Sequence, residues 1–187
     1  TAAGMPTNLI AEFTTVNNAD SVNLSLAAAS EGIAIYFDWT GNGNVTQYLL
    51  GDSYRLFSAS TTANTNVKVY TYEPSDRITV FSMSGAKLSS FDGSRLTDAI
   101  NISVNNAGLS EIKLPENSTT LSELSLDGNN FSNFDLSNFS ALTTLSLNNN
   151  LLTGIDLSKA PGELTEGEKS AISYIFAKAH DTQCLQL

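Results

Sequence analysis

Apolar and polar residues alternate with a fixed spacing over two successive stretches of the chain. The pattern Leu-x-x-Leu-x-Leu-x-x-Asn, with a following Asp-Leu-Ser, begins at Leu121 and begins again at Leu142. The offset between the two copies is 21 residues (142 − 121). A fixed period of this length is typical of repeats that bury their apolar side against the next repeat. The pattern therefore predicts short strands that stack on one another.

A weaker form of the same pattern occupies the preceding part of the chain. Two earlier units place apolar residues at the equivalent positions: Phe81, Met83, Ala86, Leu88 and Phe91, then Ile102, Val104, Ala107, Leu109, Ile112 and Leu114. Four units thus extend from about Arg77 to Lys159. In each unit, the apolar-x-apolar alternation predicts a strand with two side chains directed inward and the one between them directed outward.

The asparagine of the repeat, Asn129 in one copy and Asn150 in the next, has a structural interpretation. An inward-facing amide can hydrogen-bond the backbone groups of the turn that leaves the strand. The two earlier units carry Ala86 and Ala107 at this position, so their turns must be satisfied in another way.

The part of the chain before the repeats has the period of antiparallel strands. Apolar residues alternate with polar ones in three runs: Val22, Leu24 and Leu26; Ile33, Ile35, Phe37 and Trp39; Val67, Val69 and Thr71. Turn-forming clusters lie at residues 29–32 and 40–44. This spacing predicts a small β-sandwich that ends near residues 73–76.

Near the C-terminus the period changes to that of a helix. Thr165 and Glu168 form a capping box, and the apolar residues that follow predict a helix over about 166–179. After it, Leu185 and Leu187 restore the Leu-x-Leu pattern. This pattern predicts a fifth repeat that carries the helix as an insertion.

The repeated pattern resembles that of the leucine-rich repeat proteins, Leu-x-x-Leu-x-Leu-x-x-Asn-x-Leu. The copies that begin at Leu121 and Leu142 match it throughout, with Phe131 as the last apolar residue of the first copy, and the two earlier units match it in part. The resemblance covers a little under half of the chain and implies a solenoid. It does not imply one function, because such solenoids serve many unrelated partners.

The sequence as a whole predicts a mainly β protein, with an N-terminal β-sandwich followed by a short leucine-rich repeat solenoid with a C-terminal helix. Residues 1–7 are interpreted as a tether or a remnant of expression. Residues 8–76 are predicted to form the sandwich, and residues 77–187 the repeat domain.

Composition narrows the classes of partner. The 187 residues carry nine basic and nineteen acidic side chains, a formal charge of −10. This balance argues against nucleic acid and against an anionic membrane surface, both of which call for a basic patch. No apolar run approaches the roughly 20 residues of a membrane span. The single cysteine, Cys184, rules out an internal disulfide framework.

The segment Ile35-Tyr36-Phe37-Asp38-Trp39-Thr40-Gly41-Asn42-Gly43 resembles the turn of PKD-type immunoglobulin-like domains. It departs from that family by the inserted Thr40 and by Asn42 in place of Asp. Together with the repeats, the layout resembles two-part surface proteins of gut-dwelling anaerobic bacteria. That resemblance implies an extracellular or outer-surface location, often with a lipid anchor.

The resemblance to leucine-rich repeat proteins also implies a binding surface, because the concave face of their strands is the usual contact surface. The outward residues of the repeats are Asn101, Ser103, Asn105, Glu123, Ser125, Asp127, Thr144, Ser146 and Asn148, and a column of serines runs through Ser82, Ser103, Ser125 and Ser146. The alternative is a solvated face, because the Trp, Tyr and Arg residues favoured at protein hot spots are missing from these positions.

Tyrosines of the N-terminal half provide an alternative, glycan-binding site. If Tyr36, Tyr70 and Tyr72 share the outer face of the sandwich, their rings can stack on sugars. The competing interpretation is cross-strand aromatic pairing or packing against the solenoid, with Trp39 directed inward like Ile35 and Phe37.

We predict no catalytic residue, no metal site and no cofactor. Asp38, Thr40 and Asn42 resemble the start of a calcium loop, but position twelve, where the EF-hand supplies Glu, is Leu49, so a hairpin turn is favoured. His180 and Cys184 lie close in sequence, yet no third group that would orient them can be named.

The leading hypothesis is a non-enzymatic cell-surface or secreted module that binds an unidentified host or bacterial protein, or mediates adhesion, through the concave face. One alternative is a carbohydrate-binding module that uses the sandwich aromatics. Another is a structural scaffold segment of a larger surface assembly. None of the three involves nucleic acid or insertion of this chain into a membrane.

Overall fold

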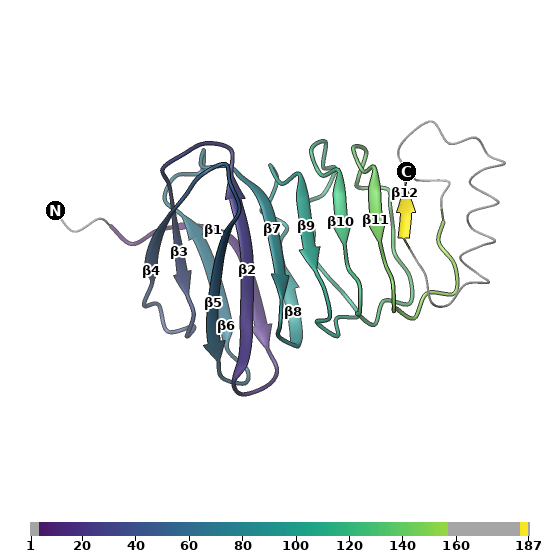
Figure 1. The fold of residues 1–187 in the computed structure, drawn as a ribbon, viewed down its shortest axis with the longest axis horizontal. Coiled ribbons are helices and arrows are strands. Elements are labelled where there is room, and N and C mark those ends of the chain that lie inside the picture. The colour runs from purple at the N-terminus through teal and green to yellow at the C-terminus, as the bar shows by residue number, and fades with distance from the viewer. Residues whose placement is uncertain (1–3, 157–183, 187) are drawn as a thin grey trace.

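The computed structural model describes residues 4–156 and 184–186. These residues form strands and connecting turns (Figure 1). The strands are β1 (Asn8–Thr15), β2 (Asp20–Ala28), β3 (Ile33–Asp38), β4 (Thr46–Leu50), β5 (Arg55–Thr61), β6 (Asn66–Thr71), β7 (Ile78–Ser84), β8 (Leu88–Asp92), β9 (Asn101–Val104), β10 (Glu123–Ser125), β11 (Thr144–Ser146) and β12 (Cys184–Gln186). The predicted helix over about 166–179 lies outside the described residues.

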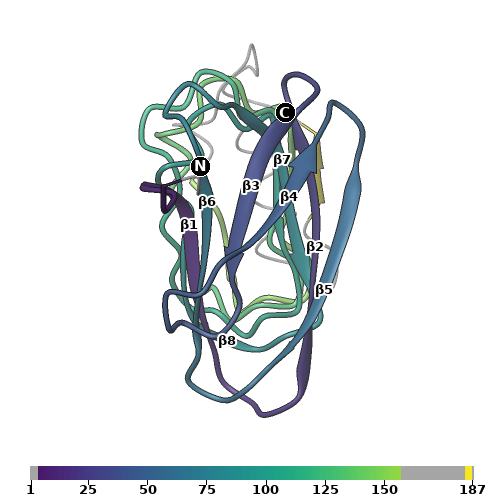
Figure 2. The same ribbon diagram turned by 90° about the vertical axis from the view of Figure 1, so that its left-hand side faces the viewer.

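The strands build two sheets that pack face to face (Figure 2). The five-stranded sheet is antiparallel, in the order β4-β3-β6-β1-β8. The seven-stranded sheet is mixed, in the order β12-β11-β10-β9-β7-β2-β5. The all-β fold with two facing sheets confirms the prediction of a β-sandwich. The three predicted runs form β2, β3 and β6, with their apolar residues largely buried.

Four strands of the larger sheet, β7, β9, β10 and β11, are parallel and in register. Phe81 lies opposite Ile102, Ile102 opposite Leu124, and Leu124 opposite Leu145. All four side chains are buried in one continuous apolar core. The prediction that equivalent apolar residues of successive units are direct neighbours is therefore confirmed.

Strand β7 belongs to both halves of the chain. It pairs in parallel with β9 on one side and antiparallel with β2 on the other, where Phe81 lies opposite Leu26. Likewise β8 pairs with β1. Strands from either side of residues 73–76, the predicted domain boundary, thus share both sheets and one core.

Three strands of the sandwich, β1, β4 and β5, were not anticipated from the pattern. In β1 a register shift between Leu9 and Ala11 interrupts the alternation, because a bulge adds a residue that points out of turn. Strands β4 and β5 are the outermost strands of their sheets. An edge strand is covered on fewer sides, so its apolar and polar residues alternate less strictly.

The direction of β12 corrects the prediction of a fifth repeat. A strand occupies the predicted place beside β11, but it runs antiparallel, with Leu185 opposite Leu145. A further repeat would run parallel, as its predecessors do. An antiparallel strand satisfies the free backbone groups of β11 equally well, and the Leu-x-Leu pattern carries no information on strand direction.

The asparagines of the repeat act as predicted. Asn129, only 3% exposed, donates its amide hydrogens to the carbonyl oxygens of Val104 and Leu126 at 2.8 and 3.0 Å, and accepts the N–H of Leu109 at 3.0 Å. Asn150 makes the equivalent set with the next turn. In the earlier unit that has Ala86, backbone groups pair directly, as where Leu88 donates to Ala107 at 2.9 Å. The amide therefore ties each turn to the one before it.

A second recurring position was not predicted. In each unit, a residue one to three positions after the strand has a positive φ: Gly85 (92°), Asn106 (57°), Gly128 (66°) and Asn149 (55°). Glycine and asparagine tolerate this left-handed conformation better than other residues do. The choice of residue type therefore fixes the direction in which the chain leaves each strand.

Replacing Gly85 with alanine is expected to lower the free energy of unfolding by about 2 kcal/mol or more. Besides the positive φ, a Cβ at Gly85 would lie 2.2 Å from the carbonyl oxygen of Ser21, a backbone atom of β2. Gly32→Ala is the matched control, because Gly32 has a φ of 80° but open space around it. Its expected loss is about 1 kcal/mol. Equal losses in chemical denaturation would mean that the contact with β2 is unimportant.

Candidate functional site

The predicted binding residues gather on the outer face of the seven-stranded sheet. We call the outward side chains of β2, β7, β9, β10 and β11, with the residues just beyond their ends, the polar face. The predicted residues form three rows across it: Asn101, Glu123 and Thr144; Ser103, Ser125 and Ser146; Asn105, Asp127 and Asn148.

The serine column of the polar face is longer than predicted. It begins in β2, because Ser25 lies opposite Ser82, which in turn lies opposite Ser103. The sequence could not reveal Ser25 as a member, since β2 precedes the repeats and runs antiparallel to them. The polar face therefore spans sandwich and repeats without interruption.

Hydrogen bonds tie the rows of the polar face to one another. The amide oxygen of Asn105 accepts the Ser125 hydroxyl at 2.9 Å and the Asp127 N–H at 2.8 Å. One step further, a carboxylate oxygen of Asp127 accepts the Ser146 hydroxyl and the Asn148 N–H, both at 2.7 Å. These polar groups are thus held in fixed positions by their neighbours on the next strand.

One acidic side chain of the polar face is exposed. Glu123 projects from β10 and accepts a hydrogen bond from the Asn101 amide at 2.8 Å. With Asp127, it makes the face acidic. The predicted positions carry neither an aromatic ring nor an arginine, so the face fits a polar partner better than an apolar one.

The predicted tyrosines lie on one face of the five-stranded sheet. Tyr36 of β3 is directly opposite Tyr70 of β6, and Tyr72 follows on the same side just beyond the strand. Their exposure differs, because Tyr36 is 6% exposed and Tyr72 43%. The ring of Tyr36 is therefore closed to a stacking sugar, whereas that of Tyr72 is open.

The N-terminal segment predicted to be a tether is described from residue 4 onward. Within residues 4–7, Pro6 is buried.

The calcium-like segment is a turn held by its own aspartate. Asp38 is 2% exposed, and its two carboxylate oxygens accept the N–H groups of Thr40 and Gly43 at 3.3 and 2.8 Å. These contacts are the ones expected of the favoured hairpin-turn interpretation. Within residues 4–156 and 184–186, no group of three or more His, Cys, Asp or Glu could hold a metal ion.

A groove of about 1070 Å³ lies on the side away from the polar face, between β8 and the turns that follow β9 and β10. Phe134 forms part of its apolar wall, in ring contact with the buried Phe131 and Phe139. Acidic groups such as Glu111 and Asp135 line its margin. The sequence did not indicate this groove, because stacking brings its lining together from three successive units.

The Asp92 carboxylate in this groove makes the stability of the fold depend on pH. Burial raises the pKa of the Asp92 carboxyl, but hydrogen bonds from the Ser94 hydroxyl and N–H and the charges of Arg95 and Lys113 lower it by more. The resulting pKa lies below the ordinary value of 3.8. A carboxylate whose pKa is lowered by folding stabilises the fold above its unfolded pKa.

The stabilising effect of Asp92 is expected to disappear on acidification. It is fully present above the unfolded pKa, about 3.9, and is lost as the pH falls through the lower pKa of the folded state. The difference in unfolding free energy between the unmodified protein and Asp92→Asn, measured in urea from pH 7 to pH 3, should be constant above about pH 5 and shrink below about pH 4. A difference that grows on acidification would contradict this sign.

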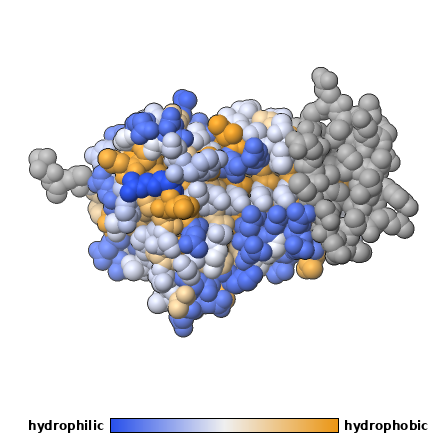
Figure 3. All heavy atoms as spheres, in the orientation of Figure 1, coloured by the Kyte–Doolittle hydropathy of each residue, from blue (hydrophilic) through white to orange (hydrophobic). Residues whose placement is uncertain are grey.

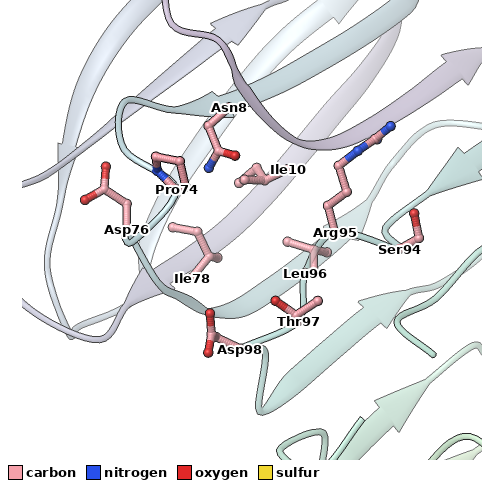
Figure 4. A pocket seen from close by; sticks show the side chains of 10 residues that line it. All are labelled: Asn8, Ile10, Pro74, Asp76, Ile78, Ser94, Arg95, Leu96, Thr97 and Asp98. Atoms are coloured by element: carbon pink, nitrogen blue, oxygen red, sulfur yellow. The ribbon is translucent and has the colours of Figure 1, made fainter. Parts of the chain in front are cut away.

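A second, smaller pocket of about 330 Å³ lies where β1 begins (Figure 4). Its floor is apolar, made by Ile10, Ile78 and Leu96, and Asp76 and Asp98 stand at its rim. Asp76 is already engaged, because its carboxylate accepts the N–H of Glu73 at 2.9 Å. We interpret the pocket as a depression of the surface over the apolar core, not as a reaction site.

The N-terminal end of the sandwich carries an aromatic cluster. Phe37 stacks on Trp39 with ring centroids 4.8 Å apart, as the predicted inward direction of Trp39 requires, and contacts Tyr48 and Phe57. The guanidinium of Arg55 lies 5.4 Å from the ring centre of Tyr48 and 5.2 Å from that of Phe57. This arrangement was not predicted, because it joins β3, β4 and β5 from both sheets.

No protein-family model matches the chain, and no curated protein and no solved structure matches it. The described residues contain no helix that is long and apolar enough to cross a bilayer. His180, one member of the His–Cys pair considered for catalysis, lies outside the described residues, and Cys184 belongs to β12.

Proposed function

We propose that the chain is a PKD-like β-sandwich joined to a short leucine-rich repeat array. Three observations support the repeat assignment. The parallel strands pair in register, 21 or 22 residues apart. The amides of Asn129 and Asn150 tie successive turns together. A left-handed residue recurs after each strand.

We further propose that the chain is a non-enzymatic cell-surface or secreted module that binds a protein partner through the polar face. The observation that carries this proposal is the continuous polar face across β2, β7, β9, β10 and β11, whose residues on and just beyond β9, β10 and β11 are hydrogen-bonded to one another. These hydrogen-bonded side chains are already fixed before any partner arrives, so binding loses little of their conformational entropy. The partner that fits is a polar protein surface with donor groups for Glu123 and Asp127.

Substitution in the row of Asn101, Glu123 and Thr144 provides the test. Ser125 and Ser146 are half-buried and donate hydrogen bonds within the face, so replacing them would disturb the fold, whereas Glu123 is exposed. The double variant Glu123→Arg, Thr144→Arg instead reverses the charge at the face and adds two long side chains. The matched control is Ser132→Arg, an exposed residue in the turn beside the groove on the opposite side.

The immobilised chain would be exposed to surface extracts of host epithelium and of neighbouring bacteria, and bound proteins identified by quantitative mass spectrometry. We expect a partner that the unmodified chain and Ser132→Arg retain equally and the double variant loses at least tenfold. Equal retention by all three chains would show that the polar face is not the binding surface.

A carbohydrate-binding function is the second candidate, favoured by the exposed ring of Tyr72 beside Tyr70. In this case Tyr72→Ala should abolish retention on a polysaccharide array, and Tyr36→Phe should leave it unchanged because that ring is buried. If neither a protein nor a glycan is retained, the third hypothesis, a scaffold segment of a larger surface assembly, becomes the better account.

A further inference from the structure

The free edge of β5 has the properties of a site for an added strand. β5 is the last strand of the seven-stranded sheet. The carbonyl oxygen of Thr61 accepts the N–H of Ala19, the residue just before β2, at 2.8 Å, so Thr61 directs its backbone toward β2. Successive residues of a strand direct their backbone groups to opposite sides. The N–H and C=O groups of Leu56, Ser58 and Ser60 therefore point away from the sheet.

Apart from Arg55 at its first position, the β5 edge lacks the features that usually prevent pairing. Its seven residues contain no proline, and Arg55 is the single charged residue. Proline, inward charges and bulges are the common protections of edge strands. The far edge of β8 is covered, by contrast, because Gly93 donates to Lys113 at 2.8 Å and Lys113 donates to Phe91 at 3.1 Å.

Exposed apolar side chains surround this edge. Leu56 is 78% exposed, Tyr54 68% and Leu49 56%. Figure 3 shows apolar patches at this N-terminal end of the molecule. Apolar groups that gather on an otherwise polar surface mark contact sites.

Arg55 is a cation held in place without an acidic partner. The guanidinium rests over Tyr48 and Phe57 and donates one hydrogen bond, at 2.5 Å, to the carbonyl oxygen of Leu49. Among the residues that the structure describes, the one ion pair is Arg95 with Asp92. A guanidinium has five N–H donors and suits a carboxylate that binds through both oxygens.

We propose that an extended segment of a partner protein pairs antiparallel with β5 as an additional strand. Its chemistry follows from the edge. It has an apolar side chain opposite Leu56 and an acidic side chain opposite Arg55, one residue further toward its C-terminus. Backbone hydrogen bonds to Leu56, Ser58 and Ser60 provide affinity, and these two side chains provide specificity.

A second copy of this chain fits the edge less well. In the symmetric antiparallel pairing centred on Ser58, Leu56 would face Ser60 of the other copy and Arg55 would face Thr61. Neither the exposed leucine nor the unpaired guanidinium gains a complementary group. Two chains of formal charge −10 also repel each other.

A seven-residue peptide tests the proposal without a known partner. The probe, acetyl-Thr-Val-Thr-Val-Thr-Val-Glu-amide with a fluorescent label, places its Glu opposite Arg55 and its last Val opposite Leu56. We expect saturable binding in fluorescence anisotropy, about tenfold weaker binding when Gln replaces the Glu, and loss of this difference in Arg55→Gln. Ser60→Pro should abolish binding, and Ser60→Thr should retain it, because only proline removes an outward N–H.

N-methylation of the peptide keeps the test independent of protein variants. Methylating the central Val blocks the edge that faces β5, whereas methylating the neighbouring Thr blocks the opposite edge. Binding should be lost in the first case and kept in the second. Equal binding of both, no binding of the parent peptide up to about 1 mM, or a chain dimer that already buries Leu56 would overturn the proposal. None of these outcomes depends on the polar face.

Discussion

Replacing Asn129 with alanine is expected to lower the free energy of unfolding by about 3–4 kcal/mol. The side chain is 3% exposed and serves one backbone N–H and two carbonyl oxygens of two successive turns. Alanine would leave these groups buried without partners, and each such group costs about 1–3 kcal/mol. Urea denaturation followed by far-ultraviolet circular dichroism measures the loss.

Two further substitutions separate the role of the amide from a general effect of mutation at this turn. Asn130→Ala removes an adjacent, exposed amide that makes one hydrogen bond, to the carbonyl oxygen of Gly108, and should cost less than about 1 kcal/mol. Asn129→Asp keeps the size but replaces the donor group with an oxygen that faces carbonyl oxygens. We expect it to be at least as destabilising as alanine. A loss below about 0.5 kcal/mol for Asn129→Ala would refute the role of the amide.

Replacing Phe81 with alanine is expected to cost about 3–5 kcal/mol, the range for removing a fully buried aromatic ring. Phe81 is inaccessible to solvent in β7 and contacts the ring of Phe91, with centroids 5.7 Å apart. Because β7 is the strand shared by sandwich and repeats, the loss should destabilise both parts together. Unfolding should therefore remain a single transition.

Two probes placed at opposite ends of the molecule check this expectation. The fluorescence of Trp39, the single tryptophan, reports on the sandwich. Hydrogen exchange at Leu145 in β11 reports on the parallel strands. Both should shift to lower denaturant by the same amount in Phe81→Ala, and by less in Phe81→Leu. Separate transitions would indicate two independently folding domains divided near residues 73–76.

The shared strand β7 also has a consequence for binding. The last strand of a stack of parallel strands normally exposes apolar surface that a cap must cover. Here β2 continues the sheet beyond β7, and Ser25 continues the serine column beyond Ser82. The sandwich therefore covers the apolar end of the parallel strands and also extends the polar face. A partner bound there could contact residues from both halves of the chain.

Period and residue type were enough to predict much of the fold. The 21-residue spacing predicted that Leu124 and Leu145 are neighbours, because a stacked unit can bury its apolar side only against an equivalent unit. The amide at Asn129 was predictable for a related reason, since a buried turn must have its backbone groups satisfied. The alternation in β2, β3 and β6 indicated a sandwich, because those central strands are covered on one face.

The remaining features depend on contacts that no local pattern encodes. The direction of β12 and the membership of Ser25 in the polar face each join segments that are far apart in the sequence. The position of Arg55 over Tyr48 and Phe57 depends on how the edge strands of the two sheets pack against each other. Strand pairing satisfies the same backbone groups in either direction, and edge strands have no strict alternation. The sequence by itself thus determined which side chains are buried and how many residues separate successive strands of the parallel array. Only the tertiary structure decided which strands meet and which edge stays open, because those choices rest on the packing of the whole core.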